Sequence, residues 1–481
     1  MATSPSRRPV RRILPLLIAS VVVGGGALML GPRIAGAPVP PPDVEPGAIA
    51  LASPTPLAPT QPSASPGRSS SPRASAVATP DAASGAPPDA SSSPSLGPSA
   101  TASASIAPDP IGRPERLSAT LAKRLTLDQQ LDRLRWRTGI PGVSVAIIFP
   151  DGTTWLGQSG LADVEAGALV GADTAFAIAS VTKTFTAAVV LDLVDDGLID
   201  LDGRVRGYLP DLDIEMDERT TVRQLLDHTS GLRDYFFHPR IDRALLAKPA
   251  ASWTAARSLG YVGKPYFRAG RGWHYSNTNY LVLGMLAEAV SGERLADLYR
   301  TRFFVPLGLR DTVYQPAGPA SGPIAHGYRF ATTGRSAKPL DLSDGTDIVP
   351  FTSVVTAAAA AGGIASSADD VARWARALYG GQALSPESLG AMLGGIERTD
   401  RLDPRIPYGL GVQAVELDGH LTYGHSGRLL GFRSLMRHLP AEGITIVVLT
   451  NQSRTDPTGI ARELLRVALR PIERCSCTGR D

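Results

Sequence analysis

Apolar segments recur along the chain from about 113 to 472, and each has the length of a strand or a helix in a globular domain. Five have the apolar and β-branched composition of strands: 143–149, 153–157, 410–417, 431–439 and 444–450. Pro150-Asp151-Gly152 separates the first two segments. This tripeptide predicts a β-hairpin, because Pro, Asp and Gly favour tight turns.

Apolar residues at helical spacing predict helices at 180–197, 221–227, 278–290, 368–379 and 457–469. Gly197 and Gly292 are suited to helix C-termini, and Ser366 or Ser367 is placed to cap the helix at 368–379. Strands occur at both ends of this region and helices lie between them. We therefore expect the two ends to join one sheet, with a second, mostly helical lobe beside it.

The first 37 residues have the composition of a membrane-directed segment. Four arginines within positions 7–12 precede an uncharged run over 13–31. As a helix this run would reach about 28 Å, close to the thickness of a bilayer core. Ala-Gly-Ala at 35–37 resembles a cleavage site, although Pro38 fits one poorly. We predict a signal sequence or a retained membrane anchor at 1–37, with the rest of the chain outside the cytoplasm.

Residues 38–112 are dominated by Pro, Ala and Ser. This composition buries too little apolar surface to offset the entropy of ordering, so it predicts a disordered linker. Fully extended, roughly 75 residues at about 3.1 Å each would span on the order of 230 Å. The linker is either a stalk that lets a domain at 113–472 search a thick layer beside the membrane, or a spacer without a selected length.

Charge and cysteine content limit the remaining classes of function. The net charge is +3, but Lys and Arg in 113–472 are not interleaved with aromatic residues, so we expect no nucleic-acid partner. The two cysteines, Cys475 and Cys477, lie in a tail at 473–481, so no disulfide can cross-link the globular region. Two thiols without a nearby histidine make a weak metal site. We expect no metal and no cofactor.

A nucleophile and a base are predicted at the start of the helix at 180–197. Ser180 ends a short apolar run and Lys183 follows three residues later, so both side chains lie on one helix face. The helix macrodipole and partial burial disfavour the ammonium form of Lys183 and favour negative charge near Ser180. The alternative is a helix N-cap followed by a solvated lysine. However, Lys183 is the only one of five lysines with a serine three residues before it.

Two further motifs carry groups that acyl transfer requires. Tyr275-Ser-Asn277 is the only Tyr-x-Asn in the chain, and His425-Ser426-Gly427 is the only His-x-Gly. A tyrosine near an amine can carry protons, because a neighbouring positive charge lowers the cost of its phenolate. Asn277 can orient a substrate amide, and the small residues Ser426 and Gly427 let a substrate backbone lie alongside a strand. Alternatively, Tyr275 is a core aromatic residue and His425 an ordinary strand histidine.

Ser180-x-x-Lys183, Tyr275-x-Asn277 and His425-x-Gly427, in that order, resemble the three motifs of the serine β-lactamase and penicillin-recognising family. The similarity is to the branch of class C β-lactamases and D-alanyl-D-alanine carboxypeptidases. Supporting stretches that also resemble this family are 225–232, 275–280, 306–309 and 362–370. The resemblance implies an α+β fold, in which an antiparallel sheet is flanked by helices and the site lies between the sheet and a mostly helical second lobe.

The resemblance also implies roles for the motif residues. Ser180 would attack a carbonyl and form an acyl-enzyme, while Lys183 and Tyr275 move its proton to the leaving group. The backbone N–H groups of Ser180 and Arg428 would hold the oxyanion, and Asn277 would hold the substrate. Class C β-lactamases usually carry Lys-Thr-Gly as the third motif. A mostly neutral His425 attracts a carboxylate less than lysine does, which argues against an efficient β-lactamase.

We therefore predict an extracytoplasmic serine hydrolase, membrane-anchored or secreted, that acts on D-amino-acid-containing peptides of peptidoglycan and releases terminal D-alanine. An esterase or a β-lactamase-like hydrolase on the same scaffold is the alternative enzyme. A noncatalytic penicillin-binding or wall-sensing protein is the alternative from another class. The chain contains no Gly-x-Ser-x-Gly, which argues against an α/β-hydrolase.

Overall fold

The computed structural model describes residues 114–330, 338–400 and 407–471. The predicted membrane segment at 1–37, the linker at 38–112 and the tail at 473–481 lie outside the described residues. No helix within the described ranges is both long and apolar enough to cross a bilayer.

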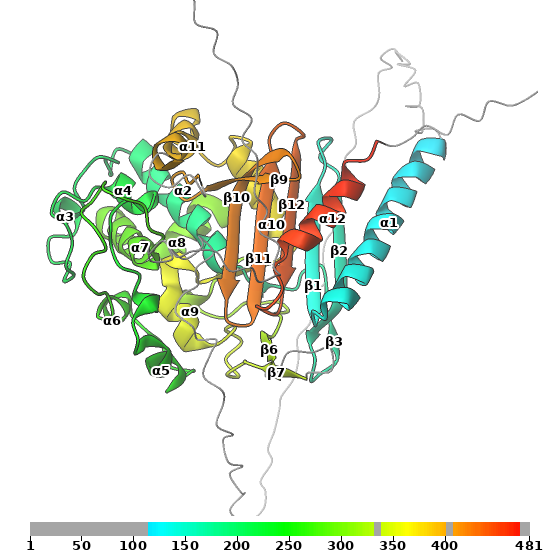
Figure 1. The fold of residues 1–481 in the computed structure, drawn as a ribbon, viewed down its shortest axis with the longest axis horizontal. Helices are drawn as coiled ribbons and strands as arrows, with labels where there is room; N and C mark the ends of the chain where they lie inside the picture. Colours follow the sequence, from blue (N-terminus) through cyan, green and yellow to red (C-terminus); the bar gives the residue numbers. More distant parts are fainter. Residues whose placement is uncertain (1–113, 331–337, 401–406, 472–481) are drawn as a thin grey trace, which may run out of the picture. The chain divides into compact units, whose positions relative to one another are not determined.

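An antiparallel sheet forms the centre of the described fold (Figure 1). Its strands are β1 (Gly142–Ile148), β2 (Thr154–Asp163), β3 (Ala168–Leu169), β9 (Gln413–Leu417), β10 (His420–Leu429), β11 (Phe432–Leu439) and β12 (Ile444–Thr450). They follow the order β3-β2-β1-β12-β11-β10-β9, and every neighbouring pair is antiparallel. Val143 of β1 lies opposite Thr450 of β12. The prediction that both ends of the region join one sheet is confirmed.

Most helices lie in a lobe beside this sheet (Figure 1). The helices are α1 (Pro114–Thr138), α2 (Thr182–Asp195), α3 (Val205–Tyr208), α4 (Val222–Leu226), α5 (Ile241–Leu246), α6 (Ala255–Leu259), α7 (Asn277–Ser291), α8 (Leu295–Tyr299), α9 (Thr352–Ala358), α10 (Ala368–Tyr379), α11 (Pro386–Asp400) and α12 (Thr458–Ala468). Short helical turns are η1 (Ala179–Val181), η2 (Tyr235–Phe237), η3 (Arg300–Phe304), η4 (Gln315–Ala317) and η5 (Ala359–Ala361). Two small sheets comprise β4 (Phe176–Ala177), β8 (Ile364–Ser366) and β5 (Val313–Tyr314), and β6 (Tyr328–Phe330) with β7 (Pro339–Asp341).

The two faces of the central sheet pack into different apolar cores, because successive side chains of a strand point to opposite faces. Val145 and Ile147 of β1 belong to a core that also contains residues of α1 and α12. Ala146, between them, belongs to the larger core that includes α10. Helices α1 and α12 therefore cover one face, and α10 packs against the other.

Helix α2 connects the sheet to the helical lobe. Phe185 of α2 stacks on Trp374 of α10, with ring centroids 4.0 Å apart. The Trp374 indole N–H donates to Thr184 Oγ at 2.8 Å. Helix α2 also packs against α7 of the lobe. The first turn of α2 is therefore held at the boundary between the two parts.

The predicted strands and helices are present, and the α+β class is confirmed. Two strand boundaries differ from the sequence prediction. Strand β2 continues past Gly157 to Asp163, and β9 begins at Gln413 because Gly411, with φ of +81°, turns the chain just before it. The apolar pattern did not predict α1, α3, α5, α6, α8, α9 or α11, and it did not predict the short strands β3 to β8 or strand β10.

Candidate active site

Ser180 lies in turn η1, directly before α2. Its neighbours Ala179 and Val181 are buried, whereas Ser180 is half-buried. Ala179 has φ of +49°, a left-handed conformation that costs a non-glycine residue free energy and is typical of functional sites. The backbone before the serine is thus bent sharply enough to leave its hydroxyl partly accessible at a helix start.

Lys183 is fully buried, and its amine lies next to Ser180. The Nζ atom is 3.1 Å from Ser180 Oγ, 2.7 Å from Asn277 Oδ1 and 2.7 Å from the Ala361 carbonyl oxygen. The last two atoms can only accept hydrogen bonds. A neutral amine therefore gives its two hydrogens to Asn277 and Ala361, and its lone pair faces the Ser180 hydroxyl. This is the geometry of a base beside a nucleophile.

The protonation of Lys183 depends on burial. Burial lowers the pKa of Lys183 to about 7, and the negative charge of Asp234 partly opposes this shift. The neutral amine is therefore well populated at neutral pH, as a general base requires.

Tyr275 lies beside the same amine. Lys183 Nζ is 4.9 Å from the centre of the Tyr275 ring and 5.4 Å from that of Tyr280. The Tyr275 ring also packs against His228 and His425, with centroids 4.3 Å and 6.2 Å away. The structure therefore brings Tyr275 to the Ser180–Lys183 pair although more than ninety positions separate Tyr275 from them in the sequence. Its role in proton transfer stays a prediction.

Asn277, the first residue of α7, joins Lys183 to a carboxylate that sequence reasoning missed. Its Oδ1 accepts from Lys183, and its Nδ2 donates to Asp234 Oδ2 at 2.7 Å. Both ends of the amide are thus bound within the protein, and its predicted contact with substrate stays a prediction. Asp234 carries no motif of its own, and no spacing signal in the sequence connects it with Asn277.

His425 of β10 is buried and neutral. Burial lowers the pKa of His425 well below its ordinary value. Its Nδ1 lies 2.6 Å from the carbonyl oxygen of Ser426, and its Nε2 lies 2.9 Å from the Tyr408 hydroxyl. A carbonyl only accepts, so we assign the proton to Nδ1, with Tyr408 donating to Nε2. The neutral state agrees with the expectation for this position.

Strand β10 packs against the turn that carries Ser180. A Cβ built at Gly427 would lie 2.4 Å from the Ile178 carbonyl oxygen, so only glycine fits there. Strand β9 pairs with β10 only from His420 to Gly424. The edge of β10 after Gly424 therefore extends past the end of β9. The Ser426 N–H points to this edge, where it donates to Gln413 Oε1 at 3.1 Å. The N–H of Arg428, two residues on, points the same way.

This arrangement suits the predicted roles of the strand. Arg428 and Ser180 lie on two segments that are in contact, as an oxyanion site made from both backbones requires. Ser426 and Gly427 line an edge to which an extended peptide can add. These roles stay predictions.

His228 is a residue of the site that sequence reasoning did not single out. It is fully buried with φ of +64°. Its Nδ1 accepts from the Ser276 N–H at 3.2 Å and lies 3.0 Å from Asn279 Nδ2. The His228 ring also packs on Tyr275. His228 therefore contacts the Tyr275-Ser-Asn277 motif through both its ring and its Nδ1 atom. Its place in the stretch 225–232, which resembles the family, was the available signal.

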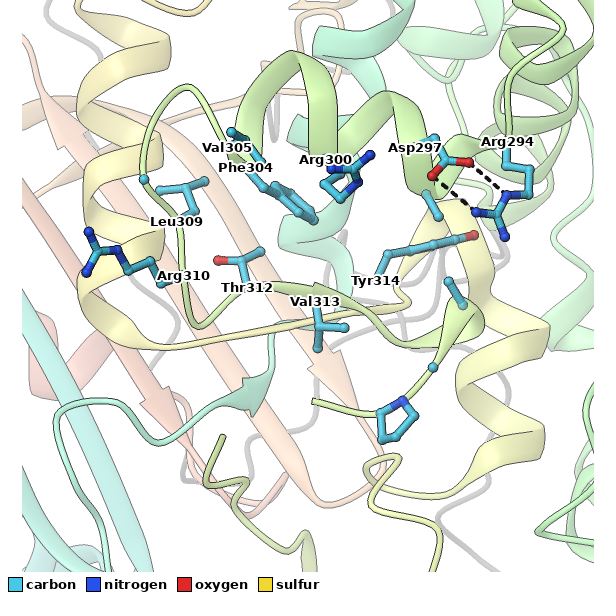
Figure 2. A pocket seen from close by; sticks show the side chains of 15 residues that line it. Arg294, Asp297, Arg300, Phe304, Val305, Leu309, Arg310, Thr312, Val313 and Tyr314 are labelled. Carbon is cyan, nitrogen blue, oxygen red and sulfur yellow. Dashed lines mark hydrogen bonds and ion pairs between the residues drawn. The ribbon is translucent and has the colours of Figure 1, made fainter. Parts of the chain in front are cut away.

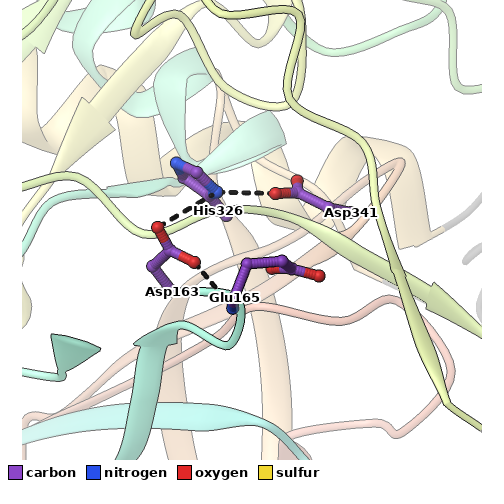
Figure 3. A group of neighbouring side chains, drawn as sticks. All are labelled: Asp163, Glu165, His326 and Asp341. Carbon is purple, nitrogen blue, oxygen red and sulfur yellow. Dashed lines mark hydrogen bonds and ion pairs between the residues drawn. The ribbon is translucent and has the colours of Figure 1, made fainter. Parts of the chain in front are cut away.

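One group of side chains in the described ranges has the composition of a cation site (Figure 3). Ligand atoms of Asp163, Glu165, His326 and Asp341 lie within 4.8 Å of one another. His326 Nδ1 is 2.7 Å from Asp341, and the Tyr328 hydroxyl donates to Glu165 at 2.8 Å. These contacts account for the grouping without an ion, and we assign no metal to it.

A pocket of about 740 Å³ lies around α8, η3 and β5 (Figure 2). Arg294, Arg300 and Arg310 line it, and Arg294 is paired with Asp297 at 2.7 Å. None of the predicted site residues lines this pocket. It is therefore separate from the site around Ser180, and we assign no role to it.

Comparisons with known proteins agree with this site. A family model described as beta-lactamase matches residues 127–469. The chain is 30% identical over 355 residues to penicillin-binding protein 4 of Amycolatopsis lactamdurans, covering 70% of this chain and 88% of that protein. It is 28% identical over 340 residues to a D-aminopeptidase of Brucella anthropi, covering 68% of this chain and 59% of that protein. The chain thus spans less than two thirds of the second relative.

Two solved structures match this chain over nearly their whole length. A D-stereospecific amidohydrolase from Streptomyces sp. is 27% identical, with a TM-score of 0.60, covering 73% of this chain and 98% of that one. The D-amino acid amidase from Ochrobactrum anthropi SV3, complexed with D-phenylalanine, is 26% identical with a TM-score of 0.60. That match covers 72% of this chain and 99% of the amidase.

Proposed function

The chain belongs to the beta-lactamase family of serine hydrolases, and we propose that it hydrolyses amides and peptides whose acyl residue is a D-amino acid. One observation carries the catalytic part of this proposal. The buried amine of Lys183, with a pKa of about 7, lies 3.1 Å from the Ser180 hydroxyl. A neutral amine at that distance can remove the hydroxyl proton.

In the acylation step, Ser180 Oγ attacks the substrate carbonyl carbon while its proton passes to Lys183. The carbonyl oxygen becomes an oxyanion, held by the backbone N–H groups of Ser180 and Arg428. The bond to the leaving nitrogen then breaks. Tyr275 donates a proton to that nitrogen and is reprotonated by Lys183. An ester between Ser180 and the acyl group remains.

In the deacylation step, water attacks the ester carbon and loses a proton to the Tyr275 and Lys183 pair. The bond to Ser180 Oγ breaks, and the serine regains its proton. The products are a carboxylic acid and the amine released earlier. No metal or cofactor takes part in either step as we propose it.

The stereochemical preference is supported by the relatives. Their names describe a D-aminopeptidase, a D-stereospecific amidohydrolase and a D-amino acid amidase. A carboxypeptidase that releases terminal D-alanine is the second candidate, and it must accept a substrate carboxylate. Because burial lowers the pKa of His425 and leaves it neutral, the third motif offers that carboxylate little attraction. We therefore favour uncharged D-amides and N-terminal D-residues as substrates.

We further propose that the protein acts outside the cytoplasm, held near the membrane, on wall-derived peptides. The arginines at 7–12, the uncharged run at 13–31 and the Pro, Ala and Ser-rich stretch at 38–112 support this location. Protease added to intact spheroplasts should then degrade the protein. Recovery of a protected, full-length chain from the cytosolic fraction would contradict the location.

The activity is tested by comparing the wild type with Ser180→Ala on matched substrates. We expect D-alanine amide to be hydrolysed at least about tenfold faster than L-alanine amide, and Ser180→Ala to hydrolyse neither. An acylated D-Ala-D-Ala peptide cleaved faster than the amide would favour the carboxypeptidase. Turnover of esters alone would favour the esterase. Stable labelling by a fluorescent penicillin with no turnover of any substrate would favour the noncatalytic protein.

A further inference from the structure

Asp234 lies behind the catalytic groups, on the far side of Asn277 from Lys183. We propose that Asp234 is a positioning residue: through Asn277 it holds the Lys183 amine in the orientation that receives the Ser180 proton. This inference rests on the proposed serine-hydrolase function. No motif of the sequence assigns a role to Asp234.

The carboxylate of Asp234 is buried, and both of its oxygens accept hydrogen bonds. The residue is 1% exposed. One oxygen accepts from the Phe236 N–H at 2.9 Å, which caps turn η2. The other oxygen accepts from the Asn277 N–H at 3.0 Å and from Asn277 Nδ2 at 2.7 Å. Three N–H donors on one buried side chain match an ionised carboxylate, which only accepts.

These contacts determine how the Asn277 amide is turned. With Nδ2 on Asp234, Oδ1 must face Lys183, where it accepts at 2.7 Å. The flipped amide would place its NH2 group against the amine and its oxygen against the carboxylate. Both contacts would be unfavourable. Asp234 thereby gives Lys183 a fixed acceptor, and the Ala361 carbonyl supplies the second. With both hydrogens of the neutral amine donated to these acceptors, its lone pair is directed at Ser180.

Asp234 also supplies negative charge to a buried cation. The titratable groups that face Lys183 from the surrounding elements are His228, Tyr275, Tyr280, His425 and Asp234. Burial lowers the pKa of both histidines, so they are neutral, and burial raises the pKa of Tyr280. Burial raises the pKa of Asp234, while the N–H donors of Asn277 and Phe236 and the charge of Lys183 oppose that shift. Because three N–H donors and, among the described residues, no acceptor contact its carboxylate, we assign Asp234 as the anion of this set. After Ser180 has lost its proton and before the leaving nitrogen receives it, Lys183 holds an additional positive charge, which the carboxylate stabilises.

The capping role and the positioning role use different oxygens of Asp234, so they can be separated. Asp234→Asn keeps a carbonyl oxygen for the Phe236 N–H but replaces the second oxygen by an NH2 group, which opposes the Asn277 donors. Asp234→Ser also keeps the cap, because serine is a good N-cap residue, and it cannot reach Asn277. Asp344→Asn is the matched control. Asp344 likewise accepts backbone N–H groups, from Thr346 at 3.0 Å and Thr352 at 2.8 Å, and is not in contact with the site.

The experiment measures kcat, KM and their pH dependence for the full chain on the amide that the wild type hydrolyses. We expect Asp234→Asn and Asp234→Ser to lower kcat about 10- to 100-fold at pH 7 with KM changed less than about threefold. The negative charge favours the ammonium form, so its loss lowers the pKa of Lys183. The acid limb of kcat should then move about one unit toward lower pH. Asp344→Asn should leave the profile in place.

A second readout does not depend on turnover. The chain has only five lysines, so ε-13C-lysine NMR of the full chain can follow each amine, with Lys183 assigned by the loss of its signal in Lys183→Arg. The Lys183 titration should shift toward lower pH in both Asp234 variants. Unchanged titration and kcat, or a lowered melting temperature alone, would overturn the inference. Absence of turnover in the wild type would instead count against the proposed function, and the NMR titration would still test Asp234.

Discussion

Gly427 of β10 lies directly against Ile178, two residues before the nucleophile: a Cβ at Gly427 would come 2.4 Å from the Ile178 carbonyl oxygen. The same oxygen accepts from Ser434 Oγ of the neighbouring strand at 2.6 Å. The edge of the sheet and the Ser180 turn are therefore in backbone contact. That contact is possible because glycine has no side chain at this position.

Gly427→Ala should separate the strand from the nucleophile turn. The added methyl group meets the Ile178 oxygen and Ser434 Oγ, so we expect the free energy of unfolding to fall by about 1–3 kcal/mol. We expect kcat/KM to fall at least about tenfold, because the oxyanion donors on the two segments move apart. Urea unfolding and amide hydrolysis measure both effects. Gly390→Ala, on an exposed helix position with nothing near its Cβ, should be neutral or stabilising. Equal activity of the wild type and Gly427→Ala would contradict the prediction.

Tyr275→Phe should slow amide hydrolysis more than ester hydrolysis. An amine leaving group needs a proton, whereas an activated phenyl ester leaves without one. We expect kcat for an amide to fall by about 10²–10⁴ and kcat for a p-nitrophenyl ester to fall much less. Tyr379→Phe is the control, because that buried hydroxyl has no hydrogen-bond partner in the described structure and lies on α10. Equal losses on both substrates would argue against proton delivery by Tyr275.

Stability should fall as the solution becomes acidic, because buried histidines must take up protons. Burial lowers the pKa of His228 and His425 well below the ordinary value of about 6.5. Below about pH 6.5 the unfolded chain therefore binds more protons than the folded one, and the free energy of unfolding decreases with falling pH. Each histidine contributes up to about 1.4 kcal/mol per pH unit. Urea unfolding between pH 7 and 5 should show a shallower loss for His425→Gln than for Ser180→Ala, which keeps both histidines. Identical slopes would refute this account.

Thr184→Val tests the connection between α2 and α10. The substitution keeps the shape of the side chain but removes the acceptor of the Trp374 indole N–H, which is buried. An unpaired buried donor costs about 1–3 kcal/mol, so the midpoint of unfolding should fall accordingly. Thr126→Val, at an exposed position of α1, should change the free energy of unfolding by less than about 0.5 kcal/mol. If Thr184→Val also changes the free energy of unfolding by less than about 0.5 kcal/mol, the indole N–H has found another partner.

Local signals in the sequence were sufficient for much of the fold and for the nucleophile. Ser367 caps α10 by accepting from the Asp370 N–H, as the serine and acid spacing predicts. Ser180 and Lys183 are three residues apart on one helical segment, so their proximity follows from helix geometry. Gly292 ends α7 with φ of +71° in the same way.

Tertiary contacts were predicted where family motifs marked both partners, as for Lys183 and Tyr275, and escaped prediction where no motif marked them. Asp234 and Asn277 are 43 positions apart, and an isolated aspartate near a turn has no periodicity or motif to distinguish it. The neutral state of His425 could be anticipated from its residue type, but its bond to Tyr408 could not. The apolar pattern also missed α1. Leu127, Leu131 and Leu134 are buried at helical spacing, but Leu121 and Leu125 are exposed. Leucines outside the buried stripe weaken the periodic signal.

The pairing of β1 with β12 has a consequence for biosynthesis. Val143 and its partner Thr450 are roughly three hundred positions apart, so a ribosome that adds about 5–20 residues per second completes β12 many seconds after β1. During that interval the nascent chain exposes an apolar strand edge, which is prone to aggregation. A polypeptide truncated before Ile444 would lack the middle of the sheet rather than its rim. Such fragments should be held by chaperones or degraded.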